Sequence, residues 1–116
     1  MKSSSGKYSV GFHMWIGKDE GHFIGLGRVR LLENIKATGS ITNGAKMMKM
    51  SYRQAWQMIE DMNKISGTPL VEKILGGKGG GGAKVTEAGE KVIKLFYQID
   101  DKMRKTAEKL SEKISL

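Results

Sequence analysis

Cysteine is absent from this chain of 116 residues. The sequence therefore excludes disulfides, thiolate nucleophiles and zinc sites built on cysteine, and it fits a reducing compartment. Long apolar runs are absent as well, since none approaches the roughly 20 residues that a helix needs to cross a bilayer. The first residues also lack the apolar segment of a secretory signal. We therefore expect a cytoplasmic protein without a membrane partner.

Sets of residues typical of a catalytic centre are missing too. Asp100 and Asp101 are adjacent on a predicted helix, so their carboxylates point in different directions. No nucleophile, base and orienting group occur together. The only histidines, His13 and His22, fall in one predicted hairpin and leave a metal site open, although two ordinary strand residues are the favoured interpretation. We therefore predict that the protein is not an enzyme and holds no metal or cofactor.

Acidic residues are outnumbered, with 12 Asp plus Glu against 20 Lys plus Arg and a formal net charge of +8. A basic excess of this size on a small protein favours a polyanionic partner, with nucleic acid first and an anionic membrane surface second. The length, together with the lack of an internal repeat or a long linker, predicts one domain over residues 1–116. Such a domain is large enough for a modest hydrophobic core.

The N-terminal third predicts a β-hairpin followed by a helix. From Tyr8 to Ile16, apolar and polar residues alternate with the period of a strand. Residues 17–21 predict a turn, and residues 22–24 a short return strand. A helix is expected from Leu26 to Ala37, followed by Gly39 at a position where a left-handed backbone is common.

Residues 40–66 carry the pattern that says most about function. Ser40 can cap a short helix, and the small Ala45 allows that helix to cross the next one closely. Ser51 and Gln54 form the Ser-x-x-Gln capping box of a second helix. The turn between them needs a positive φ, which falls on Lys49 or Met50 at a cost of about 1 kcal/mol. Two short helices joined by a tight turn predict a helix-turn-helix over about 40–66.

The second helix of this motif is amphipathic, and its outer face is polar from the first turn. Recognition helices place their N-terminal side chains on base edges in the major groove, where Arg suits guanine and Gln suits adenine. We predict base or groove contacts from one group of residues, with a phosphate contact from the last of them: Ser51, Tyr52, Arg53, Gln54, Gln57 and Lys64. The alternatives are a solvated face, packing of Tyr52 and Trp56 between helices, and a Gln54 side chain occupied by its own cap.

Two short predicted strands, at 70–75 and 83–85, are joined by a glycine loop. After a helix-turn-helix this arrangement predicts a wing over about 70–85, with phosphate contacts from Lys73, Lys78 and Lys84. A nucleotide-binding loop of the Walker type is rejected, because it requires Ser or Thr after its lysine and Lys78 is followed by Gly79.

The last predicted helix spans about 86–112 and begins at Thr86. Its apolar residues follow steps of four and three, which is typical of a coiled-coil seam. We therefore predict a homodimer through Val92, Phe96, Ile99, Met103 and Leu110. Charges of both signs on the outer face disfavour a membrane-surface helix. The fold class is α+β, mainly α: a winged helix-turn-helix with an N-terminal β-hairpin and a long C-terminal dimerisation helix.

These residues also resemble a known family. TGSITNGAKMMKMSYRQAWQMIEDMN and GTPLVEKILGGKGGGGAKVTEAGEKVI are similar to the N-terminal DNA-binding half of molybdate-responsive regulators of the ModE type. That half is a winged helix related to the one in LysR-type regulators. The similarity runs from about Phe12 to Leu95 and includes SYR-x-AW at 51–56, PLVE at 69–72 and GG-x-GGGGA at 76–83.

The resemblance implies a dimeric transcription regulator with its second motif helix in the major groove. The family usually has glycine where this chain has Lys49. Its full-length members continue into molybdate-binding modules, so no residue here carries over as a molybdate ligand and the effector stays open.

We therefore expect a sequence-specific regulator of transcription that binds double-stranded DNA as a homodimer. One alternative is a non-specific architectural or chromatin protein, motivated by the net charge. The other is a protein-interaction module that uses the wing and the last helix. Selection from random duplexes separates the first two, and a lack of DNA retardation at low salt would indicate the third.

Overall fold

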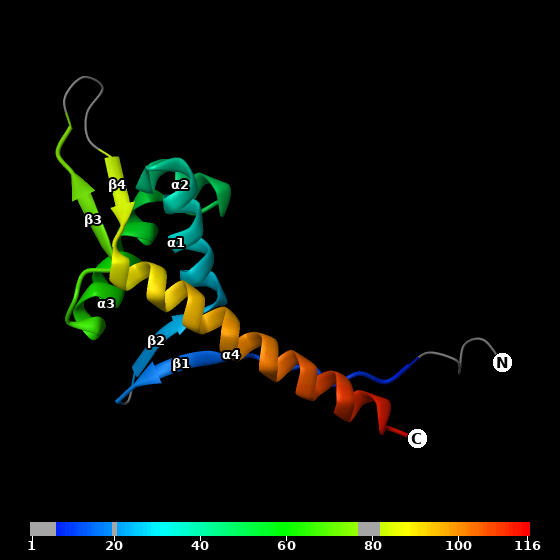
Figure 1. Cartoon of the computed structure of the whole chain (residues 1–116). Helices are drawn as coiled ribbons and strands as arrows, with labels where there is room; N and C mark the ends of the chain where they lie inside the picture. Colours follow the sequence, from blue (N-terminus) through cyan, green and yellow to red (C-terminus); the bar gives the residue numbers. More distant parts are fainter. Residues whose placement is uncertain (1–6, 20, 77–81) are drawn as a thin grey trace.

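The computed structural model describes residues 7–19, 21–76 and 82–116. Its elements follow one another as β1 (Trp15–Lys18), β2 (Gly21–Gly25), α1 (Leu26–Thr38), α2 (Ile41–Met47), α3 (Tyr52–Ser66), β3 (Val71–Ile74), β4 (Gly82–Val85) and α4 (Glu87–Glu112). Figure 1 shows the first three helices and the β3–β4 hairpin gathered around the start of α4, while the rest of α4 projects away from them. The predicted mainly helical winged helix-turn-helix is confirmed.

The N-terminal hairpin is confirmed, but its first strand is shorter than predicted. β1 begins at Trp15 and pairs antiparallel with β2 from Trp15 opposite Gly25 to Lys18 opposite Gly21. The prediction of a strand from Tyr8 was wrong, because a return strand of five residues offers no partner to the residues before Trp15. The earlier segment runs beside the end of α4, where the backbone N–H of Val10 donates to Ser111 Oγ at 2.8 Å.

The hydrophobic core is built around α1, whose Val29, Leu32 and Ile35 are fully buried. α2 lies close to α1 because Gly44 has no side chain. A Cβ at that position would meet Ile35 Cγ1 at 3.1 Å. The predicted small residue Ala45 is also buried, at 1% exposure, in the same core.

α1 is tied to α4 by polar contacts as well as by the core. Tyr97 Oη donates to the Glu33 carboxylate at 2.6 Å, and Lys36 Nζ lies 2.7 Å from Glu90 Oε1. Burial and the bond to Glu33 raise the pKa of Tyr97 to about 12, so this phenol keeps its proton through the neutral range. These contacts join α1 to the first half of α4.

The three predicted helix caps are present. Ser40 Oγ accepts from the backbone N–H of Asn43 at 3.0 Å, and Thr86 Oγ1 accepts from that of Gly89 at 3.1 Å. At α3 the capping box is complete, because Ser51 also donates its backbone N–H to the Gln54 side chain at 3.1 Å. Each cap satisfies an N–H that has no partner within its helix.

The turn between α2 and α3 places Lys49 in the left-handed region, at a φ of 57°. The predicted positive φ is therefore confirmed at Lys49. A side chain in this region costs about 1–2 kcal/mol relative to a right-handed conformation.

We expect Lys49→Gly to raise the free energy of unfolding by about 0.5–1 kcal/mol, because relief of this strain exceeds the extra freedom of glycine in the unfolded chain. Lys46→Gly is the matched control, since Lys46 lies within α2 and the same change there should destabilise by about 1 kcal/mol. Urea unfolding of both variants measures the difference. Equal destabilisation by the two would contradict the assignment of strain to Lys49.

The predicted wing is an antiparallel hairpin of β3 and β4. It is fixed at its base, where Ala83 donates its backbone N–H to Gly39 O at 2.9 Å and Thr86 donates to Leu70 O at 2.9 Å. Gly39 has the predicted left-handed backbone, with a φ of 69°. The body of the protein therefore sets the direction in which the wing leaves it.

The apolar seam of α4 is divided between the core and the surface. Phe96 is only 1% exposed and packs in the core of its own chain, while Met103 and Leu110 are 43% and 48% exposed. Val92 and Ile99 are half-buried. A partner helix would therefore meet mainly the second half of the predicted seam. Among the described residues, no helix combines the length and the apolar character that crossing a membrane requires.

Candidate nucleic-acid interface

The exposed face of α3 begins at its capped end. Ala55, Ile59 and Met62 are fully buried and fix the inner face of the helix. The predicted amphipathic character is confirmed, because the polar residues on the side away from this inner face are exposed: Arg53, Gln57, Glu60 and Lys64. Ser51, Tyr52 and Gln54 are exposed around the first turn. The structure therefore exposes the predicted groove residues of the cap and the first two turns of α3, whereas Lys64 lies in the last turn.

Two of these side chains already make contacts within the helix. Gln54 Oε1 accepts from the backbone N–H of Ser51, so its carbonyl belongs to the cap, as one of the alternatives anticipated. Gln57 Nε2 donates to Asp61 Oδ1 at 3.0 Å, one turn further along. Gln57 can thus offer a base its carbonyl oxygen and the second hydrogen of its NH₂ group, and the exposed Arg53 can offer its guanidinium.

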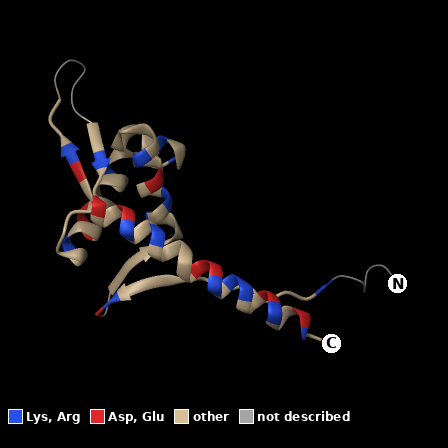
Figure 2. Ribbon diagram, viewed as in Figure 1, with Lys and Arg blue, Asp and Glu red and all other residues tan. Residues whose placement is uncertain are grey.

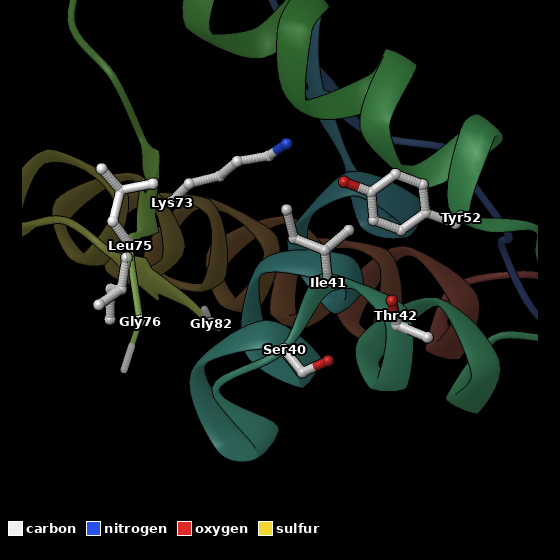
Figure 3. Close-up of a pocket in the computed structure, with 9 residues that line it drawn as sticks. Ser40, Ile41, Thr42, Tyr52, Lys73, Leu75, Gly76 and Gly82 are labelled. Carbon is white, nitrogen blue, oxygen red and sulfur yellow. The ribbon is translucent and has the colours of Figure 1, made fainter. Parts of the chain in front are cut away.

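The wing contributes Lys73 to the same side of the molecule. Its Nζ lies 4.3 Å from the centre of the Trp56 ring, a cation–π contact between β3 and α3. A cavity of about 350 Å³ lies between this lysine, Tyr52 and the start of α2. Figure 3 shows Tyr52 and Ile41 on one side of it, with Lys73 reaching across from the wing. Sequence reasoning assigned Lys73 to a phosphate contact and considered Trp56 as packing between helices, but it did not predict this contact.

The other predicted basic contacts lie apart from Lys73. Lys84 pairs across the hairpin with Glu72, whereas Lys73 pairs with the buried Ala83, so the two lysines are on opposite faces of the wing. Lys64 is exposed in the last turn of α3, about 16 Å along the helix axis from Arg53. Lys78 lies outside the described residues. Lys64, Lys78 and Lys84 remain predictions.

The basic excess does not come from α4. This helix contains six basic and six acidic residues, so the whole net charge of +8 belongs to the rest of the chain. Two of its basic side chains also pair with carboxylates one turn away, Arg104 with Asp100 and Lys105 with Asp101. Figure 2 shows blue and red alternating along α4. The charge that attracts a polyanion is therefore carried mainly by the residues before α4, which include α1, the helix-turn-helix and the wing.

Sequence reasoning missed Asp61 and Arg28. Asp61 accepts from Gln57 and lies 3.6 Å from Arg28 Nη2 on α1. The spacing of four residues between Gln57 and Asp61 is a recognisable helical pair and could have been used. The contact with Arg28 joins residues 33 positions apart, and no local pattern indicates it.

Comparison with known proteins identifies the family. The family model of bacterial regulatory helix-turn-helix proteins of the lysR family matches residues 26–90. The chain is 52% identical over 69 residues to the transcriptional regulator ModE of Yersinia pestis, covering 60% of this chain and 26% of that protein. It is 42% identical over 85 residues to the DNA-binding transcriptional dual regulator ModE of Escherichia coli strain K12, covering 73% of this chain and 32% of that protein.

The chain thus spans between a quarter and a third of these two curated relatives. The crystal structure of a LysR family transcriptional regulator matches it with a TM-score of 0.55 at 15% identity, over 74% of this chain and 28% of that one. That match supports the fold, and the sequence matches confirm the predicted resemblance to ModE regulators. The chain belongs to the lysR family of bacterial regulatory helix-turn-helix proteins.

Proposed function

We propose that this protein binds double-stranded DNA in a sequence-specific manner and regulates transcription. The observation that carries the proposal is the capped start of α3, where Arg53 and Gln57 are exposed. The opposite side of the helix is anchored in the core by buried residues, so this face points to solvent. The names of the ModE relatives, which describe transcriptional regulators, support it. The role needs no catalytic residue, and we expect it to be carried out in the cytoplasm.

Affinity and specificity come from different parts of the surface. Lysine and arginine side chains that neutralise phosphates release counterions, which gives affinity that falls as salt rises. The start of α3 enters the major groove and contacts base edges. Lys73 lies against Trp56 of α3, and we expect this wing residue to contact the DNA backbone next to that groove.

Arg53→Ala tests the base-reading role. We expect affinity for a selected site to fall by about 5- to 150-fold, which is the value of one good bidentate contact between arginine and guanine. Lys109→Ala is the matched control, because it removes one positive charge from the last turn of α4. Binding of both variants to the selected site and to random DNA should be measured at one salt concentration.

An equal loss by Arg53→Ala on selected and random DNA would contradict base reading. It would favour a second candidate function, the non-specific architectural protein, which the net charge of +8 supports. That candidate also predicts no enriched motif after selection from random duplexes.

We further propose that the protein acts as a homodimer through α4. The half of this helix that projects from the body presents Met103 and Leu110, each more than two fifths exposed, together with the half-buried Ile99. Apolar residues at this spacing are typical of a helix paired with another helix. A dimer would place two copies of α3 on half-sites about 10 base pairs, or a multiple of that, apart. A single monomeric species in sedimentation at micromolar concentration would contradict the proposal.

A further inference from the structure

We propose that Asp61 sets the base preference of Gln57, by holding its amide so that the carbonyl oxygen faces the DNA. This inference rests on the proposed function. Asp61 acts through Gln57 and is therefore a positioning residue. The base it favours is one that offers an exocyclic amine in the major groove, with adenine first.

The orientation of the Gln57 amide follows from its partner. Gln57 Nε2 lies 3.0 Å from Asp61 Oδ1, one helical turn away. An ionised carboxylate only accepts hydrogen bonds, so the NH₂ group of the amide must face it. The carbonyl oxygen, on the opposite branch of the planar amide, is directed away from Asp61. Without this partner, the amide could rotate by half a turn and present either group outward.

The Asp61 carboxylate is itself held from a different part of the fold. Arg28 Nη2 lies 3.6 Å from Asp61 Oδ2, the oxygen that Gln57 does not use. Arg28 Nη1 in turn donates to the backbone carbonyls of Phe23 at 3.0 Å and His22 at 3.3 Å. The guanidinium is thus fixed between β2 and the carboxylate, and its side chain is only 23% exposed. The two carboxylate oxygens have separate partners, which limits the rotation of the group.

Base chemistry then determines what Gln57 can recognise. In the major groove, adenine and cytosine present amine donors at N6 and N4, whereas guanine and thymine present only acceptors at the corresponding edges. The carbonyl oxygen of Gln57 can accept a hydrogen bond from adenine or cytosine, and it is repelled by the acceptor atoms of guanine and thymine. The remaining hydrogen on Nε2 can donate to adenine N7, so adenine satisfies both groups of Gln57. We therefore expect adenine on the strand that Gln57 faces.

Asp61→Asn should reverse this orientation. Arg28 only donates, so the oxygen of Asn at this position turns toward Arg28 and its NH₂ group turns toward Gln57. Gln57 then accepts with its carbonyl and presents its NH₂ group to the DNA. Bases that present acceptors in the major groove then become tolerated. Guanine or thymine replaces adenine or cytosine as the preferred base at the position that Gln57 contacts.

The experiment measures affinity for four duplexes that differ only at the base pair read by Gln57. Selection from random duplexes with the unmodified protein gives the site, and Gln57→Ala identifies the position at which preference is lost. For Asp61→Asn we expect the ratio of adenine to guanine affinity at that position to fall at least about fivefold, the lower value of one bidentate contact. Asp101→Asn is the matched control, because it makes the same chemical change on an exposed residue of α4, away from the α3 surface.

The outcomes separate this inference from the proposed function. If no motif is enriched, sequence-specific binding itself is wrong. If a motif is enriched but Gln57→Ala alters no position, or if Asp61→Asn keeps the adenine preference as Asp101→Asn does, only the role of Asp61 is overturned. Circular dichroism and the urea midpoint of each variant show whether it is folded. An Arg28→Met variant should relax the same position, since it frees the carboxylate without changing Gln57 or Asp61.

Discussion

Phe96→Ala is expected to lower the free energy of unfolding by about 3–5 kcal/mol, the usual result of removing a buried aromatic ring. Phe96 is 1% exposed in the single chain and belongs to the core that contains α1 and α3. A domain of this size is stabilised by only about 5–15 kcal/mol, so the loss is a large fraction of the total. Urea unfolding monitored by circular dichroism measures it, and the loss should be present at every protein concentration.

Leu110→Ala is the matched control on the same helix. Leu110 is 48% exposed, so its truncation should change the stability of one chain by less than about 1 kcal/mol.

The double variant Met103→Glu, Leu110→Glu should dissociate the proposed dimer in sedimentation and leave the chain folded. A Phe96→Ala protein that dissociates without losing stability would show that the ring packs against a partner rather than in its own core.

The division of the α4 seam shows a limit of reasoning from sequence. Steps of four and three place Val92, Phe96, Ile99, Met103 and Leu110 on one stripe, and the stripe is there. The same spacing serves a helix packed on its own body and a helix packed on another chain. Where the body ends along α4 depends on the length of α1 and on the ties from Glu33 and Lys36, which lie more than 50 residues earlier. No pattern within the helix contains that information.

The prediction of a strand from Tyr8 was wrong for a related reason. Alternation from Tyr8 to Ile16 gives the period of a strand, but a strand also needs a partner along its whole length. β2 spans only Gly21–Gly25, so pairing ends at Trp15. The caps at Ser40, Ser51 and Thr86 were predictable because capping depends on residues three positions apart.

The candidate site was predicted in its parts but not in its connections. The exposed residues of α3 follow from helical periodicity. Lys73 over Trp56, and Arg28 against Asp61, join residues from different elements and depend on how those elements pack. The opposite faces of Lys73 and Lys84 follow from strand alternation, yet only the packing of the hairpin shows that the Lys73 face meets α3.

The base of the wing gives the second large prediction. Gly89 lies in the first turn of α4, directly against the residue that precedes β3. A Cβ there would overlap Leu70 O and would lie 2.6 Å from Val85 Cγ1. Leu70 O cannot retreat freely, because it accepts the backbone N–H of Thr86 at 2.9 Å. We expect Gly89→Ala to lower the free energy of unfolding by about 3 kcal/mol, the upper part of the range for overpacked sites.

Gly27→Ala provides the matched control for this prediction, since Gly27 occupies the first turn of α1 and an added Cβ meets nothing within 4 Å. The same change there should be neutral or stabilise by up to about 1 kcal/mol, as expected from helix propensity. Urea unfolding should therefore give free energies of unfolding for the two variants that differ by about 3 kcal/mol or more, with Gly89→Ala the less stable. Equal midpoints would mean that α4 does not pack on the base of the wing as described, and Lys73 would then lack a fixed position relative to α3.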